Sequence, residues 1–346
     1  MDIKYDRRSF LQTAATAGAA AAAGQVSTAA QLNPGDGRRR FHFVQVDVFT
    51  SRRLQGNPLA VFTDARGLSD SEMQDLARET NLQETTFAFP RDAATEREQG
   101  VRVRIFVPNE EIPFGGHPTL GTAMVLRSMR LALQKSGSTM SAEIAKITLD
   151  LKVGKVPVDF RTDQSGNVFG EMHQVDPIFG PIHDRDNIAA LLDLSPGDIS
   201  SDAPIQTLST GLFFIIVPIK NLSTLQRLMV APQKAYDYLN RQKLPGLSDF
   251  YYITRETGDA EVGLRSRGIF SSPGEDPATG SAAGCTAAWM VRYGIAKPDE
   301  VVHILQGVEI KRPSHIYVRA SKHGDNINNV RVGGHAVQIM EGTVSL

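Results

Sequence analysis

The chain has 346 residues, of which 41% are hydrophobic and 22% are charged, an ordinary globular composition with room for two domains. The formal net charge of −1, without a basic run or interleaved aromatic residues, gives no electrostatic reason to expect a nucleic-acid partner. The single cysteine, Cys285, excludes an internal disulfide, a cysteine-based metal cluster and a two-cysteine acid/base mechanism within one chain.

The first thirty residues differ in composition from the rest. A pair of arginines, Arg7 and Arg8, precedes a weakly apolar run of Ala, Gly and Thr, and small residues end the segment near Ala30. This order resembles a twin-arginine export signal, so residues 1–30 are predicted to be a signal peptide and the mature protein periplasmic. A disordered Ala-rich tail is the alternative. Stable membrane insertion is not expected, because a span needs roughly twenty strongly apolar residues.

The first half of the chain then reads mainly as strands. Residues 31–40 are polar and contain Gly and Pro, which indicates a linker. Alternating apolar and polar residues predict strands over 41–49, 58–62, 84–89 and 101–107. A capping box formed by Ser69 and Glu72 predicts a helix from there to Thr80. Another helix is expected between the turn at 108–113 and Leu133.

The rest of the chain continues in the same manner. Strands are predicted over 144–153, 155–161, 168–174, 211–218, 250–254 and 261–266, with four short strands between 301 and 344. Helices are predicted over 186–194, after Asn221, over 232–243 and after Asp276. Because strands outnumber helices and follow one another as in hairpins, the predicted fold class is α+β and not a doubly wound sheet.

One stretch of the chain has a second copy. His117–Ala123 (HPTLGTA) aligns without a gap with Asp276–Ala282 (DPATGSA), 159 residues further on. Each copy is a turn marked by Pro and Gly that leads into small and apolar residues, the pattern of a loop entering a helix. The start of a helix favours an anion, so two such ends predict a site that holds a small carboxylate between two related halves. For either copy alone, an ordinary helix entry is the simpler interpretation.

The helices that begin at these copies lack a polar face. The residues from Ala282 to Ala288 are small on every side, whereas a surface helix carries a charged stripe. We therefore expect each helix to be buried at the centre of a mainly antiparallel sheet that curls around it. The predicted domains are 41–165 and 166–346, and the last strand of the second can return to the first.

Glu84 is the first candidate for chemistry. It lies where a helix gives way to a strand. Burial among Phe87, Phe89 and Pro58 would raise its pKa and suit it to exchanging a proton near neutral pH. A solvated surface carboxylate is the simpler alternative.

The turns supply the other candidates. His117 follows two glycines and precedes a proline, so its ring is expected to point out of the turn. Asp276 holds the equivalent place in the second copy, and Ser281 falls in the first turn of the helix behind it. Helix capping, worth about 1 kcal/mol each, would explain Asp276 and Ser281. The alternative is that Ser281 and the Gly280 amide bind a substrate carboxylate or amine.

Four motifs follow the order of a known family: GNPLAVF from Gly56, NLQETTF from Asn81, PFGGHPTLGTA from Pro113 and DPATGSAAG from Asp276. Together they resemble the phenazine-biosynthesis PhzF-like isomerases, which are related in fold to diaminopimelate epimerase. The resemblance covers the chain from about residue 41 to the C-terminus. It implies two similar domains, each a mainly antiparallel sheet around a central helix, with the site in the cleft between them.

The resemblance also implies an activity. It implies an isomerase without a cofactor or metal, in which a glutamate moves a proton between two carbons of a small cyclic substrate. It assigns catalytic roles to Glu84, His117 and Asp276. It assigns substrate binding to Gly116, Gly280 and Ser281. The expected partner is a small-molecule carboxylate, and a homodimer remains open.

Two departures from the family pattern bear on the substrate and the chemistry. Family members often carry Ser immediately before the catalytic Glu, whereas this chain has Gln83, whose longer amide would reshape the pocket. The phenazine precursor is therefore not assumed to be the substrate. The epimerase relatives use two cysteines, and Cys285 is interpreted as a core residue.

Two rival functions remain open. A hydrolase could be built from Ser281, His117 and Asp276, although no nucleophile-elbow pattern surrounds the serine. A periplasmic binding protein could have kept the cleft without the chemistry, although capture of a carboxylate would not need both Glu84 and His117.

Overall fold

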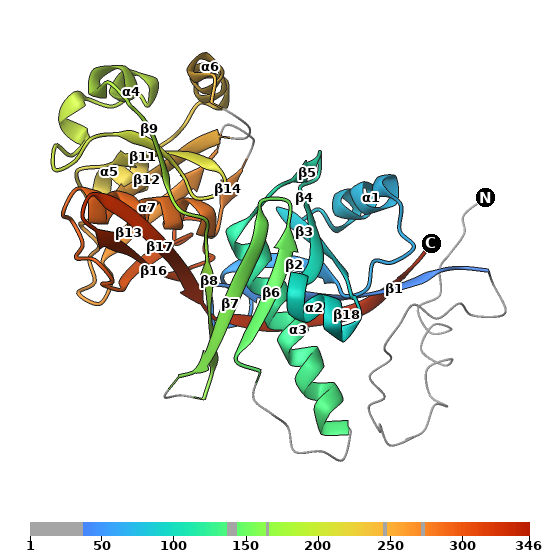
Figure 1. Cartoon of the computed structure of the whole chain (residues 1–346). Coiled ribbons are helices and arrows are strands. Elements are labelled where there is room, and N and C mark those ends of the chain that lie inside the picture. Colours follow the sequence, from blue (N-terminus) through green and yellow to red (C-terminus); the bar gives the residue numbers. More distant parts are fainter. Residues whose placement is uncertain (1–36, 137–143, 164–165, 245–247, 271–273) are drawn as a thin grey trace, which may run out of the picture.

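Two buried helices, α3 (Gly116–Ser136) and α7 (Gly280–Arg292), lie at the centres of the two halves of the chain. The computed structural model describes residues 37–136, 144–163, 166–244, 248–270 and 274–346. The predicted signal peptide (1–30) and most of the predicted linker (31–40) lie outside the described residues. Figure 1 shows α7 among the yellow to red strands of one half and α3 among the blue to green strands of the other.

The first half is a layer of strands that curls around α3. Its strands, in the order in which they are hydrogen-bonded, are β18 (Ala336–Ser345), β1 (Arg40–Val48), β2 (Asn57–Phe62), β3 (Glu84–Phe89), β4 (Val101–Phe106), β6 (Lys146–Leu151), β7 (Gly154–Thr162) and β8 (Val168–His173). The β2–β3 and β4–β6 pairs are parallel and the others are antiparallel. The two-residue strand β5 (Glu111–Ile112) pairs with β4 just before α3 begins.

The second half repeats this arrangement around α7. Its strands, in the same order, are β9 (Ile178–Ile182), β10 (Gln206–Ser209), β11 (Phe213–Pro218), β12 (Ser248–Thr254), β13 (Leu264–Ile269), β15 (Val302–Gln306), β16 (Ser314–His323) and β17 (Asn326–Gly334). The β11–β12 and β13–β15 pairs are parallel and the others are antiparallel. The two-residue strand β14 (Glu275–Asp276) pairs with β13 just before α7 begins.

The two layers are joined into one continuous sheet, whereas we expected two separate sheets. Strands β8 and β17 pair antiparallel, from His173 opposite Arg331 to Gly170 opposite Gly334. The pairing satisfies backbone groups that two free edges would leave exposed. Two strands cross over between the layers: β9 follows β8 of the first layer along the chain but pairs with β10 of the second, and β18 follows β17 of the second layer but pairs with β1 of the first. The halves thus share one order of strand pairs; that they arose by duplication stays a prediction.

The absence of a polar face on the two central helices reflects their burial, as predicted. Every residue from Gly280 to Val291 is buried, and α3 is buried from Gly116 to Arg127. Small residues let other groups approach closely. A Cβ atom on Gly284 would lie 1.9 Å from Oε1 of Gln174, so a larger residue here would displace the buried Gln174 amide.

Shorter helices cover the outside of the strands. They are α1 (Asp70–Thr80), α2 (Ala93–Gln99), α4 (Arg185–Leu191), α5 (Leu222–Arg227) and α6 (Pro232–Gln242), with a 3-10 turn, η1, over Pro196–Asp198. The predicted capping box at Ser69 and Glu72 is present, and Asn221 caps α5. Over the described ranges, no helix combines the length and apolar character needed to cross a membrane.

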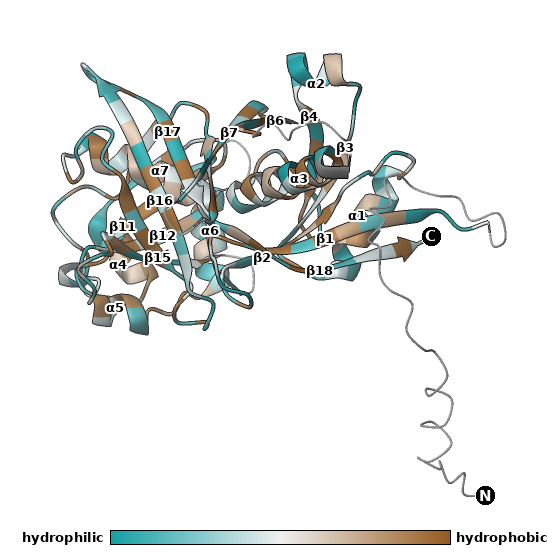
Figure 2. Ribbon diagram, turned by 90° about the horizontal axis from the view of Figure 1, so that it is seen from below, coloured by the Kyte–Doolittle hydropathy of each residue, from teal (hydrophilic) through white to brown (hydrophobic). Residues whose placement is uncertain are grey.

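The fold class is α+β, as predicted, and most predicted elements are present within a few residues of their expected ends. Figure 2 shows hydrophilic and hydrophobic residues alternating along strands such as β16, which has one face toward a helix. The helix α2 was missed because AATEREQ buries no residue and therefore has no apolar period. Three of the four C-terminal strands, predicted to be short, have nine or ten residues.

Candidate active site

The N-termini of the two central helices meet between the halves of the molecule. A Cβ atom on Gly116 would lie 2.5 Å from the carbonyl carbon of Gly280 and 2.6 Å from the amide nitrogen of Ser281. The two helix ends can touch only because both Gly116 and Gly280 lack a side chain. The amide groups in the first turn of a helix have no carbonyl partner within it, so the positive ends of two helix dipoles meet here.

Glu84 begins β3, beside Leu59 of the parallel strand β2. The same face of β3 carries Thr86, whose hydroxyl is 2.8 Å from the hydroxyl of Thr122 on α3, so Glu84 faces the central helix. The expectation that Phe87 would bury it is wrong. Phe87 lies on the opposite face of the strand, and it packs with Phe62 and the helix α1.

Burial nevertheless perturbs the Glu84 carboxyl group. Its side chain keeps 17% of its surface exposed, but Oε2 is buried. Burial first, and the negative charge of Asp276 second, raise the pKa of Glu84 well above its ordinary value. A raised pKa suits a carboxylate that must take up and return a proton near neutral pH.

His117 lies in the first turn of α3, and its ring is only 3% exposed. The ring nitrogen Nε2 lies 3.3 Å from Oε2 of Glu84. Burial lowers the pKa of His117 to about 3, so the imidazole is neutral at physiological pH. The ring therefore points into the protein, toward Glu84, as a neutral group.

Asp276 enters from the other half, at the end of β14. Its Oδ1 accepts a hydrogen bond from Nδ2 of Asn57 at 2.6 Å, and its Oδ2 accepts one from the hydroxyl of Thr279 at 2.7 Å. Burial raises the pKa of Asp276 to about 6. Because like charges in a buried site disfavour double ionisation, Glu84 and Asp276 titrate as a pair. Helix capping does not explain Asp276, since the N-cap of α7 is Thr279.

A buried network fixes the backbone around Asp276. Gln306 Nε2 donates to the Asp276 carbonyl at 2.8 Å, and its Oε1 accepts from the amide of Thr279 at 3.0 Å. The Tyr251 hydroxyl donates to the same Oε1 at 2.8 Å. The carboxylate of the preceding residue, Glu275, accepts two hydrogen bonds from Arg267, at 2.9 and 2.7 Å. Sequence reasoning missed these residues because their partners come from distant strands.

Asn57 is the missed residue that lies closest to the chemistry. It begins β2, is fully buried and contacts both His117 and Asp276. Its position in the GNPLAVF motif could have indicated a role at the site, but a sequence motif does not say which of its residues faces the other site residues.

Ser281 lies in the first turn of α7, as predicted, and is 5% exposed. In the part of the chain that the structure describes, the side chains beside the ring nitrogens of His117 are Asn57 and Glu84, not Ser281. This arrangement does not form a serine–histidine–aspartate relay. Cys285 is buried, and burial raises the pKa of its thiol to about 12, so the thiol is protonated and unreactive.

Three buried polar atoms at this junction have no hydrogen-bond partner among the described residues: Asn57 Oδ1, Glu84 Oε2 and His117 Nε2. An unpaired buried polar atom typically costs about 1–3 kcal/mol. Gln83, next to Glu84, also spans the halves, with Nε2 3.5 Å from the carbonyl of Glu275. A ligand with complementary polar groups would satisfy the three atoms, and we place the candidate site here.

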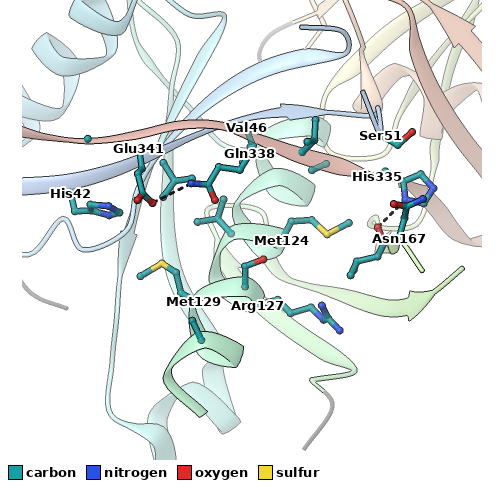
Figure 3. A pocket seen from close by; sticks show the side chains of 18 of the residues that line it. His42, Val46, Ser51, Met124, Arg127, Met129, Asn167, His335, Gln338 and Glu341 are labelled. Carbon is teal, nitrogen blue, oxygen red and sulfur yellow. Dashed lines mark hydrogen bonds between the residues drawn. The ribbon is translucent and has the colours of Figure 1, made fainter. Parts of the chain in front are cut away.

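A separate hollow of about 820 Å³ lies beside the C-terminal half of α3, between β1, β18 and the start of β8. Figure 3 shows some of its lining side chains, polar ones such as His42, Gln338 and Glu341 together with apolar ones such as Met124 and Met129. None of the predicted site residues lines it. We therefore place the site by the chemistry of its groups and not by the volume of the hollow.

The chain is similar to known proteins over most of its length. The family described as phenazine biosynthesis-like protein (PhzC-PhzF) matches residues 46–342. A trans-2,3-dihydro-3-hydroxyanthranilate isomerase of Pseudomonas chlororaphis is 32% identical over 310 residues, which cover 88% of this chain and 99% of that protein.

Solved structures agree with this similarity. A predicted epimerase from Pseudomonas aeruginosa superposes with a TM-score of 0.70 at 33% identity, covering 88% of this chain and 99% of that one. A PhzF-family phenazine biosynthesis protein from Bacillus anthracis superposes with a TM-score of 0.74 at 26% identity, with the same coverage.

Proposed function

The chain belongs to the phenazine biosynthesis-like (PhzC-PhzF) family of isomerases, and from this premise we propose that it moves a proton between two carbons of a small carboxylate-bearing substrate. One observation carries the proposal. Oε2 of Glu84 and Nε2 of His117 lie 3.3 Å apart, both buried and unpaired within the described residues, where the two halves meet. A carboxyl group with a raised pKa beside a neutral imidazole is suited to acid/base catalysis on a bound substrate.

The proposed reaction needs only side-chain chemistry. The Glu84 carboxylate takes a proton from one carbon, and the electron pair of the broken C–H bond enters the adjoining unsaturated system. The Glu84 carboxylic acid then returns the proton to a second carbon as the double bond shifts. The substrate keeps its atoms, and the enzyme ends in its starting protonation state. A hydrogen bond donated by the neutral His117 stabilises the negative charge that develops between the two steps, and the charge of Asp276 keeps the pKa of Glu84 raised.

The substrate carboxylate would bind where α3 and α7 meet. The first-turn amides of both helices and the Ser281 hydroxyl would receive its negative charge. Relatives are named for trans-2,3-dihydro-3-hydroxyanthranilate, so this compound is the first to test. Gln83 reaches across the junction, and we propose that it limits the size of the substrate that fits.

Turnover of a compound panel tests the proposal. The purified enzyme is incubated with this compound and other small unsaturated carboxylates, and products are followed by mass spectrometry. We expect one compound to rearrange without a change in mass. Glu84→Gln should lower its kcat by about 10²–10⁴-fold, because it keeps the shape but cannot take the proton. Ser281→Ala should act less, and mainly on KM, because it removes one hydrogen bond.

The rival functions predict other outcomes. A hydrolase would add the mass of water and would lose most of its activity in Ser281→Ala. A binding protein would retain a compound without converting it. Either result would overturn the proposed function.

A further inference from the structure

The amide of Asn57 links the two halves of the proposed site. Its Nδ2 lies 2.6 Å from Oδ1 of Asp276, 3.0 Å from the carbonyl oxygen of Ala278 and 3.1 Å from Nδ1 of His117. The first two contacts come from the second half of the chain and the third comes from α3. Asn57 is fully buried, so water does not compete for these contacts.

The neighbours of the amide decide which of its ends faces them. The carboxylate oxygen of Asp276 and the carbonyl oxygen of Ala278 accept hydrogen bonds, so the group between them must be the NH₂ of Asn57. The reverse orientation would place Oδ1 of Asn57 against two acceptors. The same NH₂ faces Nδ1 of His117, because one nitrogen makes all three contacts.

This orientation restricts where the imidazole carries its hydrogen. A hydrogen on Nδ1 of His117 would face the amide hydrogens of Asn57 at an N···N distance of 3.1 Å, with no acceptor between them. With Nδ1 unprotonated, the ring nitrogen is an acceptor, and the two amide hydrogens of Asn57 are shared among Nδ1 and the oxygens of Asp276 and Ala278. A neutral imidazole has one N–H group, which then lies on Nε2, 3.3 Å from Oε2 of Glu84.

The turn before Asn57 is held in place by several contacts. Gly56 has φ +69°, and a Cβ atom there would lie 2.3 Å from the carbonyl oxygen of Val48, so no other residue fits. Arg312 donates from Nε to the carbonyl of Gly56 at 2.7 Å and from Nη2 to the carboxylate of Asp47 at 2.7 Å. The amide of Asn57 therefore meets His117 from a fixed position.

We infer that Asn57 is a positioning residue, which holds His117 in the tautomer whose N–H lies on Nε2, the ring nitrogen beside Glu84. In that tautomer a neutral His117 can donate a hydrogen bond to a substrate while Glu84 acts as the base. The catalytic consequence rests on the proposed function. The tautomer itself does not, and it can be measured without a substrate.

The test is ¹⁵N NMR of the imidazole nitrogens in the full chain, with the His117 signals identified by their loss in His117→Gln. We expect His117 in the wild type to be unprotonated at Nδ1 and protonated at Nε2. Asn57→Asp exchanges the donor for an acceptor of the same shape, so it should move the hydrogen to Nδ1. Asn57→Ala removes the donor and should leave a mixture of the two tautomers.

His183 provides an internal control in the same spectra. Its Nδ1 is 2.8 Å from the Tyr238 hydroxyl and its Nε2 is 2.7 Å from the Thr207 hydroxyl, in contacts that do not involve Asn57. Unchanged His183 signals show that a variant has kept its fold. If Asn57→Asp does not fold, Asn57→Ala carries the test.

Three results would overturn the inference: a hydrogen on Nδ1 of His117 in the wild type, a charged ring at neutral pH, or an unaltered tautomer in both variants. Once a substrate is known, kcat should fall by about 10²–10⁴-fold in Asn57→Asp, the usual range for one acid/base group. An enzyme that has the expected tautomer but converts no compound would refute the proposed function and leave the tautomer assignment intact.

Discussion

At the scale of single residues, Glu84 is held in an environment that opposes its ionised form. Burial and the charge of Asp276 raise its pKa well above the ordinary value. A carboxyl whose pKa is raised by folding stabilises the folded state below the pKa of the unfolded chain, and this contribution is lost as pH rises through the folded pKa. The cost of Glu84 to the folded state is therefore fully present only above its folded pKa.

Glu84→Gln should consequently stabilise the protein while it removes catalysis. We expect Tm to rise by several degrees at pH 8, where the Glu84 carboxyl group is ionised in the unfolded chain and ionisation opposes folding, and the gain to vanish below pH 4. Calorimetric scans of both proteins across this range measure the difference. An equal Tm at all pH values would show that the site does not strain the carboxylate.

Glu111 supplies a matched control of opposite sign. Its carboxylate accepts two hydrogen bonds from Arg104, at 2.9 and 2.7 Å, which lower its pKa. The stability that follows is present above the pKa of the unfolded chain and is lost as pH falls through the folded pKa. Glu111→Gln should therefore lower Tm at pH 8. The change in Tm at this pH should then have opposite signs in Glu84→Gln and Glu111→Gln.

At this scale, the sequence predicted which candidate residues would come together but not the residues that support them. Glu84, His117 and Asp276 meet as the motifs implied, although they are far apart in the chain. Asn57, Gln306 and Tyr251 could not be predicted, because a polar residue on a strand shows no sign of its partner on another strand. Strand alternation would have corrected the placement of Phe87, which shares a face with Thr85 and not with Glu84.

At the scale of elements, the site depends on the close approach of α3 and α7. The repeated turns predicted both helix starts, because Pro and Gly at these positions mark where a helix can begin. The contact between the two helix ends was beyond prediction. It depends on the positions of Gly116 and Gly280 in space, which no periodic pattern encodes.

Gly116→Ala should separate these helix ends. The added methyl group would lie 2.5 Å from the backbone of Gly280, where no flexible side chain can yield. We expect a loss of about 1–3 kcal/mol in the free energy of unfolding, measured by urea titration, and a loss of turnover. Gly197→Ala is the control, since its Cβ would meet nothing within 4 Å. Equal stability of the two variants would refute the close contact.

At the scale of the whole molecule, the two halves are tied by hydrogen bonds as well as by packing. The sequence predicted two similar layers around two helices, but not the β8–β17 pair that joins them. Edge pairing of this kind is decided by which edges remain free after each layer has formed. The crossing of β9 and β18 between the layers further ties the two layers together.

The subcellular location of the protein also concerns the whole molecule. We propose export to the periplasm, because Arg7 and Arg8 precede a weakly apolar run as in a twin-arginine signal. Replacing both arginines by lysine keeps the charge but should leave the precursor in the cytoplasm, which cell fractionation would detect. The replacement of Arg38 and Arg39 by lysine is the control. An unchanged periplasmic yield would show that the segment is not such a signal.

The central claim is that Glu84 carries a proton from one carbon of the substrate to another. It is tested most directly by placing the wild type and Glu84→Gln in deuterated water with a converted compound and locating the deuterium by NMR. A proton held on Glu84 can exchange with solvent before it is returned, so the wild type should place deuterium on the carbon that receives the proton, while Glu84→Gln binds the compound and places none. Exchange in Glu84→Gln at the rate of the wild type would contradict the claim.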